Sequence, residues 1–159
     1  MNEKLAIAGG ENHFPLEEIL NSITHGTGAL MSLAGLVLLI VFASLYGEAR
    51  HIISCTIFGV SLVLLYTAST LYHSFRKPRV KFVFRIVDHS CIYILIAGTY
   101  TPFMLVAVRG VLGWTIFGIV WGMTVLGILF KSFFIHRFKI LSTLAYIAMG
   151  WIAIFAIKP

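Results

Sequence analysis

The side chains of this sequence that could do chemistry are a serine, a histidine and an aspartate within long apolar stretches. Ser69 and His73 are four residues apart, so a helix would place both on one face. Asp88 begins the next apolar stretch and is the only acidic residue after Glu48. If the two helices are antiparallel neighbours, His73 and Asp88 lie at similar depth. A neutral imidazole and a carboxylate so placed could ligate zinc or hold a metal-bound water.

Each of these residues alone also has a purely structural interpretation. Asp88 can be a helix-start carboxylate that the helix dipole favours and that pairs with a cation such as Arg85. For Asp88 alone, the structural and functional interpretations weigh about equally. For a lone histidine such as His73, a hydrogen-bonded side chain near the membrane surface is the better interpretation. It is the combination with Ser69 that favours a functional site.

A second polar group lies on one face of the first expected helix, at the spacing i, i+3, i+4 and i+7: Glu18, Asn21, Ser22 and His25. Polar side chains of this kind hydrogen-bond between membrane helices. We therefore favour contact between helices over a catalytic role. The other histidines fall in tails and loops and receive no role: His13, His51 and His136.

The elements that must position these residues are membrane-spanning helices. The chain has 159 residues, 59% hydrophobic and only 11% charged, whereas a soluble domain has about 25% charged residues. This excludes an ordinary soluble domain and a disordered chain. Five stretches without Asp, Glu, Lys or Arg approach the roughly 20 residues that a bilayer span needs. The prediction is an all-α polytopic membrane bundle over residues 19–159, after an N-terminal segment of residues 1–18, with spans at about 23–46, 52–75, 87–108, 110–130 and 140–157.

The basic residues set the expected orientation, because cytoplasmic loops carry an excess of Lys and Arg. Nine of the 12 fall on one side: Lys4, Arg76, Lys77, Arg79, Lys81, Arg85, Lys131, Arg137 and Lys139. The other side has Arg50, Arg109 and Lys158. The N-terminus is therefore expected in the cytoplasm, in a multi-pass protein of the inner (plasma) membrane. Since these charges occupy short loops, they predict membrane topology and no nucleic-acid partner.

Proline and glycine predict local features of the helices. Pro15 can open a short interfacial helix, since proline is tolerated in a first turn. Pro102 is expected to kink or end the third span, with the hydroxyls of Thr99, Tyr100 and Thr101 satisfying the backbone groups that the proline frees. The pair Gly118 and Gly122 permits close helix approach, and we expect packing within the bundle rather than a dimer contact.

Taken together, the polar motifs resemble those of one membrane family. They are Glu18-x-x-Asn21-x-x-x-His25-Gly26, Ser69-x-x-x-His73, Asp88-His89-Ser90 and Gly98-Thr99-Tyr100-Thr101-Pro102-Phe103. They look like the haemolysin III family, the bacterial branch of the progestin and adipoQ receptor superfamily. The resemblance covers nearly the whole chain from Leu16 onward. It implies a bundle of seven helices with a cytoplasmic N-terminus, of which this sequence supplies five.

The resemblance also implies a zinc ion inside the bundle near the cytoplasmic face. His73 matches one of its histidine ligands, Ser69 matches the serine of that motif, and Asp88 matches the aspartate that holds the zinc-bound water. The other two histidines come from a His-x-x-x-His motif on the seventh helix, which this sequence lacks. We therefore expect the chain to be the front part of a longer protein and to hold no catalytic zinc alone.

Three functions follow from the resemblance. The first is a zinc-dependent hydrolase of lipid amides or esters, or its lipid-sensing descendant, with Asp88 as base and Ser69 as a donor near the zinc site. The second, which the family name implies, is a pore-forming cytolytic protein. The third is a non-catalytic factor in membrane-lipid homeostasis. Whether the protein is an enzyme stays open. The expected partners are membrane lipids, with a homo-oligomer as an alternative and no soluble partner identifiable.

Overall fold

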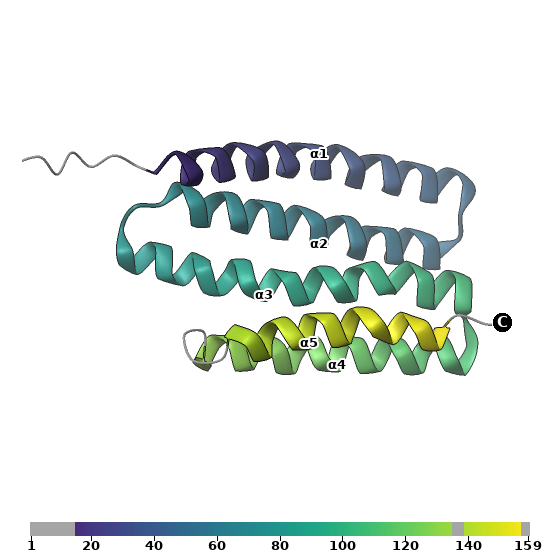
Figure 1. Cartoon of the computed structure of the whole chain (residues 1–159). Helices are drawn as coiled ribbons and strands as arrows, with labels where there is room; N and C mark the ends of the chain where they lie inside the picture. The colour runs from purple at the N-terminus through teal and green to yellow at the C-terminus, as the bar shows by residue number, and fades with distance from the viewer. Residues whose placement is uncertain (1–14, 135–138, 157–159) are drawn as a thin grey trace, which may run out of the picture.

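The fold is an antiparallel succession of long helices. The structure is a computed structural model that describes residues 15–134 and 139–156. Its elements are α1 (Leu16–Tyr46), α2 (Ala49–Ser74), α3 (Pro78–Pro102), a π-helical segment η1 (Phe103–Val108), α4 (Gly110–Phe134), α5 (Lys139–Trp151) and a 3-10 segment η2 (Ile152–Ala156). α1 packs on α2, α2 on α3, and α3 on both α4 and α5 (Figure 1). The described residues contain no strand, which confirms the all-α prediction.

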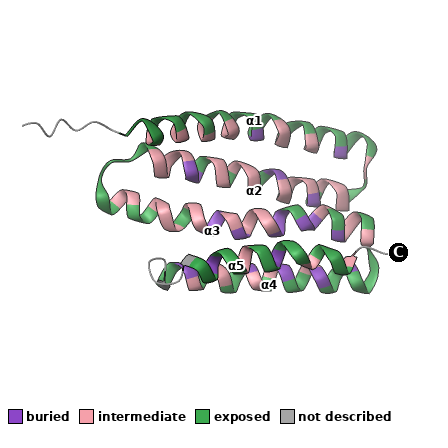
Figure 2. Ribbon diagram, in the orientation of Figure 1, coloured by how far each residue is buried: buried purple, intermediate pink, exposed green. Residues whose placement is uncertain are grey.

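Four of the described helices are long and apolar enough to cross a membrane: Leu16–Tyr46, Ala49–Ser74, Pro78–Val108 and Gly110–Phe133. The fifth expected span is a shorter apolar helix, Ile140–Ala156. Large apolar side chains are exposed along the outer faces of the helices (Figure 2). Apolar surface of this extent is what lipid, rather than water, would cover. The chain is therefore a polytopic membrane bundle.

Two helices begin earlier than the charge-free stretches predicted. α1 starts at Leu16, directly after Pro15, and runs unbroken to Tyr46, so no separate interfacial helix forms. α3 starts at Pro78, which turns most of the expected loop of residues 76–88 into helix. Proline is well suited to a first helical position because its missing N–H has no partner there. The basic residues of that segment thus lie on the first turns of a helix.

Pro102 ends α3, as expected, and the chain continues as the π-helical segment η1. The neighbouring hydroxyls bind groups other than the Gly98 carbonyl that a proline at this position frees. Thr99 and Thr101 each donate to the carbonyl four residues earlier, both at 2.8 Å. The Tyr100 hydroxyl lies 2.8 Å from two carbonyls of α5 and accepts the Ala153 N–H at 2.7 Å. The expectation for these hydroxyls was therefore wrong, and Tyr100 instead fastens α5 to α3.

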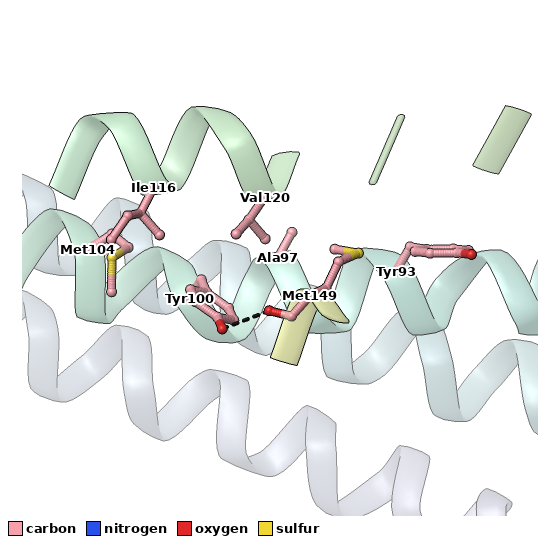
Figure 3. Close-up of a cluster of buried hydrophobic side chains, with 7 residues drawn as sticks. All are labelled: Tyr93, Ala97, Tyr100, Met104, Ile116, Val120 and Met149. Atoms are coloured by element: carbon pink, nitrogen blue, oxygen red, sulfur yellow. Dashed lines mark hydrogen bonds between the residues drawn. The ribbon is translucent and has the colours of Figure 1, made fainter. Parts of the chain in front are cut away.

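A buried cluster joins α3, α4 and α5 (Figure 3). Its members are Tyr93, Ala97, Tyr100, Met104, Ile116, Val120 and Met149. Thr124 adds a polar contact, because its hydroxyl approaches the Tyr93 carbonyl at 3.2 Å. This cluster packs the second half of α3 and η1 against the first half of α4 and against α5.

The glycines that allow close packing are not the predicted pair. Among the described residues, a Cβ built at Gly118 or Gly122 meets nothing within 4 Å, so the expectation that this pair packs against them is wrong. A Cβ at Gly98 would instead collide with Ser61 Oγ of α2, and one at Gly28 would lie 2.6 Å from the Tyr66 ring. Close approaches therefore occur between α1, α2 and α3, and α4 approaches α3 closely at Gly127 rather than at the predicted pair.

The basic side chains gather at one end of the bundle. That end contains the start of α1, the α2–α3 connection, the end of α4 and the start of α5 (Figure 1). Its described basic residues with described side chains are Arg76, Lys77, Arg79, Lys81, Arg85 and Lys131. We call it the basic end. The end of α2 and the start of α3 also place His73 and Asp88 toward it.

Candidate functional site

Glu18 links three helices at the basic end. Its Oε2 atom is 2.8 Å from His73 Nδ1 at the end of α2, and its Oε1 atom accepts a hydrogen bond from Lys81 Nζ of α3 at 2.6 Å. The Glu18 and His73 side chains are 23% and 16% exposed, so both are largely withdrawn from the surface. α1 contributes the acid, α2 the imidazole and α3 the cation. The Glu18 carboxylate thus connects to two side chains that lie 55 and 63 residues further along the sequence.

Aromatic contacts surround these groups. The His25 ring is stacked on the His73 ring, with centroids 5.6 Å apart and planes within 4°. Lys81 Nζ lies 5.2 Å from the centroid of the Tyr72 ring. We call Glu18, His25, His73 and Lys81 the Glu18 cluster. The two histidines come from different helices and form one side of it.

The geometry sets the proton positions on His73. Because Glu18 is paired with Lys81, its carboxylate is ionised and can only accept hydrogen bonds. His73 Nδ1 is therefore the donor, and the lone pair of the neutral ring is on Nε2. A carboxylate behind one nitrogen is also the usual way in which proteins orient a metal-ligating histidine. His73 is thus oriented to accept a proton, or to bind a metal ion, through Nε2.

The structure confirms the expected polar contact between α1 and α2. Besides the Glu18–His73 pair, the hydroxyls of Ser22 and Ser74 lie 2.7 Å apart. Sequence spacing placed Glu18 and His25 on one face, and Ser69 and His73 on another, but gave no reason to join the two faces. Packing of α1 on α2 makes that connection. The only sequence signal was that both groups lie at the same end of their spans.

Ser69 and Asp88 are both shielded but have different surroundings. Ser69 lies one turn before His73 and is 5% exposed. The Asp88 side chain is 13% exposed, and its carboxylate lies 3.5 Å from Nδ1 of the adjacent His89. Since His89 Nδ1 makes no hydrogen bond among the described residues, this is a long electrostatic contact. The His89 carbonyl accepts a hydrogen bond from the Tyr146 hydroxyl of α5 at 2.9 Å.

The implied metal can be compared with these positions. A catalytic zinc site uses three protein ligands and a water. In residues 15–134 and 139–156, no three His, Cys, Asp or Glu side chains gather as metal ligands would. His73 contacts Glu18 and His25 of α1, whereas Asp88 contacts the adjacent His89. No described contact joins His73 to Asp88. The described residues therefore supply one oriented imidazole and no full ligand set, and a shared His73–Asp88 site stays a prediction.

Comparisons with known proteins agree on the family. A family model described as haemolysin-III related matches residues 15–159. Hemolysin-3 of Bacillus cereus is 54% identical over 146 residues, covering 92% of this chain and 67% of the relative. The hemolysin-3 homolog of Bacillus subtilis (strain 168) is 55% identical over 143 residues, covering 90% and 67% respectively.

A more distant relative extends the comparison. Human monocyte to macrophage differentiation factor is 25% identical over 156 residues, covering 95% of this chain and 64% of that protein. The chain thus spans about two thirds of the length of the relatives that it matches. No solved structure matches it. The chain belongs to the haemolysin III family of membrane proteins, within the progestin and adipoQ receptor superfamily.

Proposed function

We propose that this protein acts on membrane lipids, cleaving an amide or ester bond through the Glu18 cluster, with the basic end facing the cytoplasm. The observation that carries the proposal is the pair of contacts that Glu18 makes with His73 and Lys81. They orient an imidazole near the end of α2, which supports a site that would open toward the lipid headgroups. Polar groups inside membrane helices mark functional sites because their burial is otherwise costly.

The residues of the cluster can move and hold one proton. His73 Nε2 accepts the proton of a water that attacks the carbonyl carbon, and it returns this proton to the amine or alcohol that leaves when the C–N or C–O bond breaks. Glu18 then stabilises the imidazolium through Nδ1, and Lys81 keeps Glu18 ionised throughout. Ser69 and Asp88 keep their proposed roles as a donor and a base beside this site.

Zinc is proposed as the cofactor of the complete site, with His73 and Asp88 as ligands. A zinc ion on His73 Nε2 would take the place of the proton there, and Asp88 would then be the base. When bound, zinc lowers the pKa of its water and polarises a carbonyl group. His73 fits such a ligand because a carboxylate orients its far nitrogen. The described residues give no third ligand, so the proton transfers above are assigned to the side chains alone.

A pore-forming protein is the second candidate, because the Bacillus cereus relative is named Hemolysin-3. The buried hydroxyls of the bundle argue for the lipid-directed function. Ser61, Thr101 and Thr124 each donate to a carbonyl of their own helix. These hydroxyls are occupied by backbone groups, and no ring of charged side chains within the described spans supports a pore.

The test is reconstitution of the whole chain into vesicles that contain amide-linked and ester-linked lipids. Product release, ion flux and metal content are measured on the same preparation, with protein-free vesicles as the control. We expect release of fatty acid from one lipid class without ion flux above the control. Ion flux without lipid turnover would overturn the proposal in favour of the pore.

A further inference from the structure

A basic cavity lies beside the Glu18 cluster, between the end of α2 and the first turns of α3. Its volume is about 360 Å³, and its lining residues are Tyr72, Arg76, Pro78, Lys81, Phe82 and Arg85. Three of the six side chains are cations. Glu18 of α1 pairs with Lys81. Arg85 makes no ion pair among the described residues.

Behind Arg85 lies a lysine that is almost fully enclosed. Lys131, near the end of α4, is only 4% exposed. Tyr93 fixes the register of the two helices, because its ring would lie 2.6 Å from a Cβ at Gly127. Arg85 is two turns before Tyr93 and Lys131 is one turn after Gly127, so antiparallel packing leaves the two cations about one turn apart along the helix axes. Arg85 is close enough to repel the Lys131 ammonium electrostatically.

The described ion pairs supply no counter-charge for these two cations. The acidic side chain nearest in sequence, Asp88, contacts His89 rather than Arg85. An excess of positive charge in cytoplasmic loops explains exposed lysines, but it does not require one to be enclosed. An enclosed ammonium without an anion is costly, and a second cation beside it adds repulsion. An oxyanion between them would remove both costs and could accept a bidentate pair of hydrogen bonds from the guanidinium.

We propose that Arg85, which lines this cavity, and Lys131 of the adjacent helix α4 together bind a phosphate group carried by an anionic phospholipid headgroup or by free phosphate. The basic end is the end of the bundle at which such headgroups would meet the protein. The site is distinct from the Glu18 cluster and does not depend on the lipid hydrolysis proposed above. It assigns a ligand class to two cations that the proton transfers at His73 do not use.

The test uses the full chain in detergent and in lipid nanodiscs, with phosphatidylglycerol, phosphatidylcholine and inorganic phosphate as probes. The variants are Arg85→Gln and Lys131→Met, the latter keeping the apolar stem of the lysine. Arg79→Gln is the matched control, because it removes an exposed cation from the first turn of α3 at the same end. Circular dichroism and elution volume establish that each variant folds. If Lys131→Met does not fold, the test relies on Arg85→Gln alone, because Arg85 is only half-buried and its replacement is easier to accommodate.

We expect phosphatidylglycerol to bind at least about fivefold more weakly to both site variants, whereas Arg79→Gln binds it like the wild type. Competition by inorganic phosphate would show that the site accepts the free ion as well. If phosphatidylglycerol binds and inorganic phosphate does not compete, the ligand of the site is the lipid headgroup rather than free phosphate. Equal affinities for wild type, Arg85→Gln and Lys131→Met would overturn the proposal, as would a loss no larger than that of Arg79→Gln.

Discussion

Glu18 is the residue on which the first three helices converge. Both of its carboxylate oxygens are used, one by His73 and one by Lys81. A protein that needed only adhesion between helices could use two serines, as Ser22 and Ser74 do. Here an acid, an imidazole and an amine, all largely enclosed, make the contact, and the proposed proton transfer rests on this choice of groups.

Glu18→Gln tests how much these contacts stabilise the bundle. The amide keeps the shape but can accept at one atom only, so either His73 or Lys81 loses its acceptor. Hydrogen bonds to charged groups contribute about 1.5–3 kcal/mol, and we expect a loss of that order in thermal unfolding in detergent.

Glu17→Gln is the control, because Glu17 is exposed one residue earlier in the same helix. It should leave the unfolding temperature nearly unchanged. If both variants unfold at the same temperature, the contacts of Glu18 do not stabilise the protein.

Sequence spacing could predict only part of this site. The i, i+4 rule relates Ser69 to His73, and the face of α1 relates Glu18 to His25, because both rules act within one helix. The pairing of Glu18 with His73 depends on how α1 packs on α2, about which neither rule says anything. The stacking of His25 on His73 was unpredictable for the same reason.

At the scale of elements, charge proved a poor guide to helix ends. The stretch from Pro78 to Asp88 contains three basic residues and was expected to be loop, yet it forms the first turns of α3. Long basic side chains can keep their charge in water while their stems cover apolar surface. The existence of every span was predictable from its apolar length, whereas the start of α3 was not.

Gly98 is where α2 and α3 approach most closely. A Cβ there would collide with Ser61 Oγ, whereas a Cβ at Gly118 meets only open space. We therefore predict that Gly98→Ala destabilises the protein by about 1–3 kcal/mol, as overpacking does. Gly118→Ala should be neutral or slightly stabilising, because alanine favours helix.

Thermal unfolding of the two alanine variants checks this contrast. A destabilised Gly118→Ala beside a neutral Gly98→Ala would mean that the helix contacts are assigned wrongly. It would also restore the sequence-based expectation that the Gly118–Gly122 pair packs against another helix.

At the scale of the whole molecule, the basic residues are distributed unevenly between the two ends of the bundle. Arg76, Lys77, Arg79, Lys81, Arg85 and Lys131 share one end with the Glu18 cluster, whereas Arg50 and Arg109 lie at the other. The cluster is therefore expected on the cytoplasmic side, where it can reach only lipids of the inner leaflet.

Reporter fusions test this orientation. Fusions after Lys77 and after Lys139 should both report a cytoplasmic location, because both positions lie at the basic end. A fusion after Gly47, at the opposite end, should report the external side. A cytoplasmic signal at Gly47 with external signals at the other two would invert the orientation.

At the end of the bundle opposite the basic end, exposed charged side chains make contacts with residues close in sequence. Glu48 pairs with Arg50 at the start of α2, and the Arg50 guanidinium lowers the pKa of the Glu48 carboxyl. This pair contributes stability at neutral pH and loses it as the pH falls through the lowered pKa. His51 Nδ1 accepts the Glu48 N–H at 3.0 Å, which completes a capping box. His51 thus has a structural role, and it offers a histidine control far from the Glu18 cluster.

The most direct test of the lipid-directed function is the rate of lipid turnover by His73→Gln compared with His51→Gln in the same vesicles. Each variant removes one imidazole from α2, and glutamine at position 51 can still form the capping box. We predict that turnover is abolished in His73→Gln and retained in His51→Gln. Equal turnover in the two variants, with both folded, would contradict the assignment of the function to the Glu18 cluster.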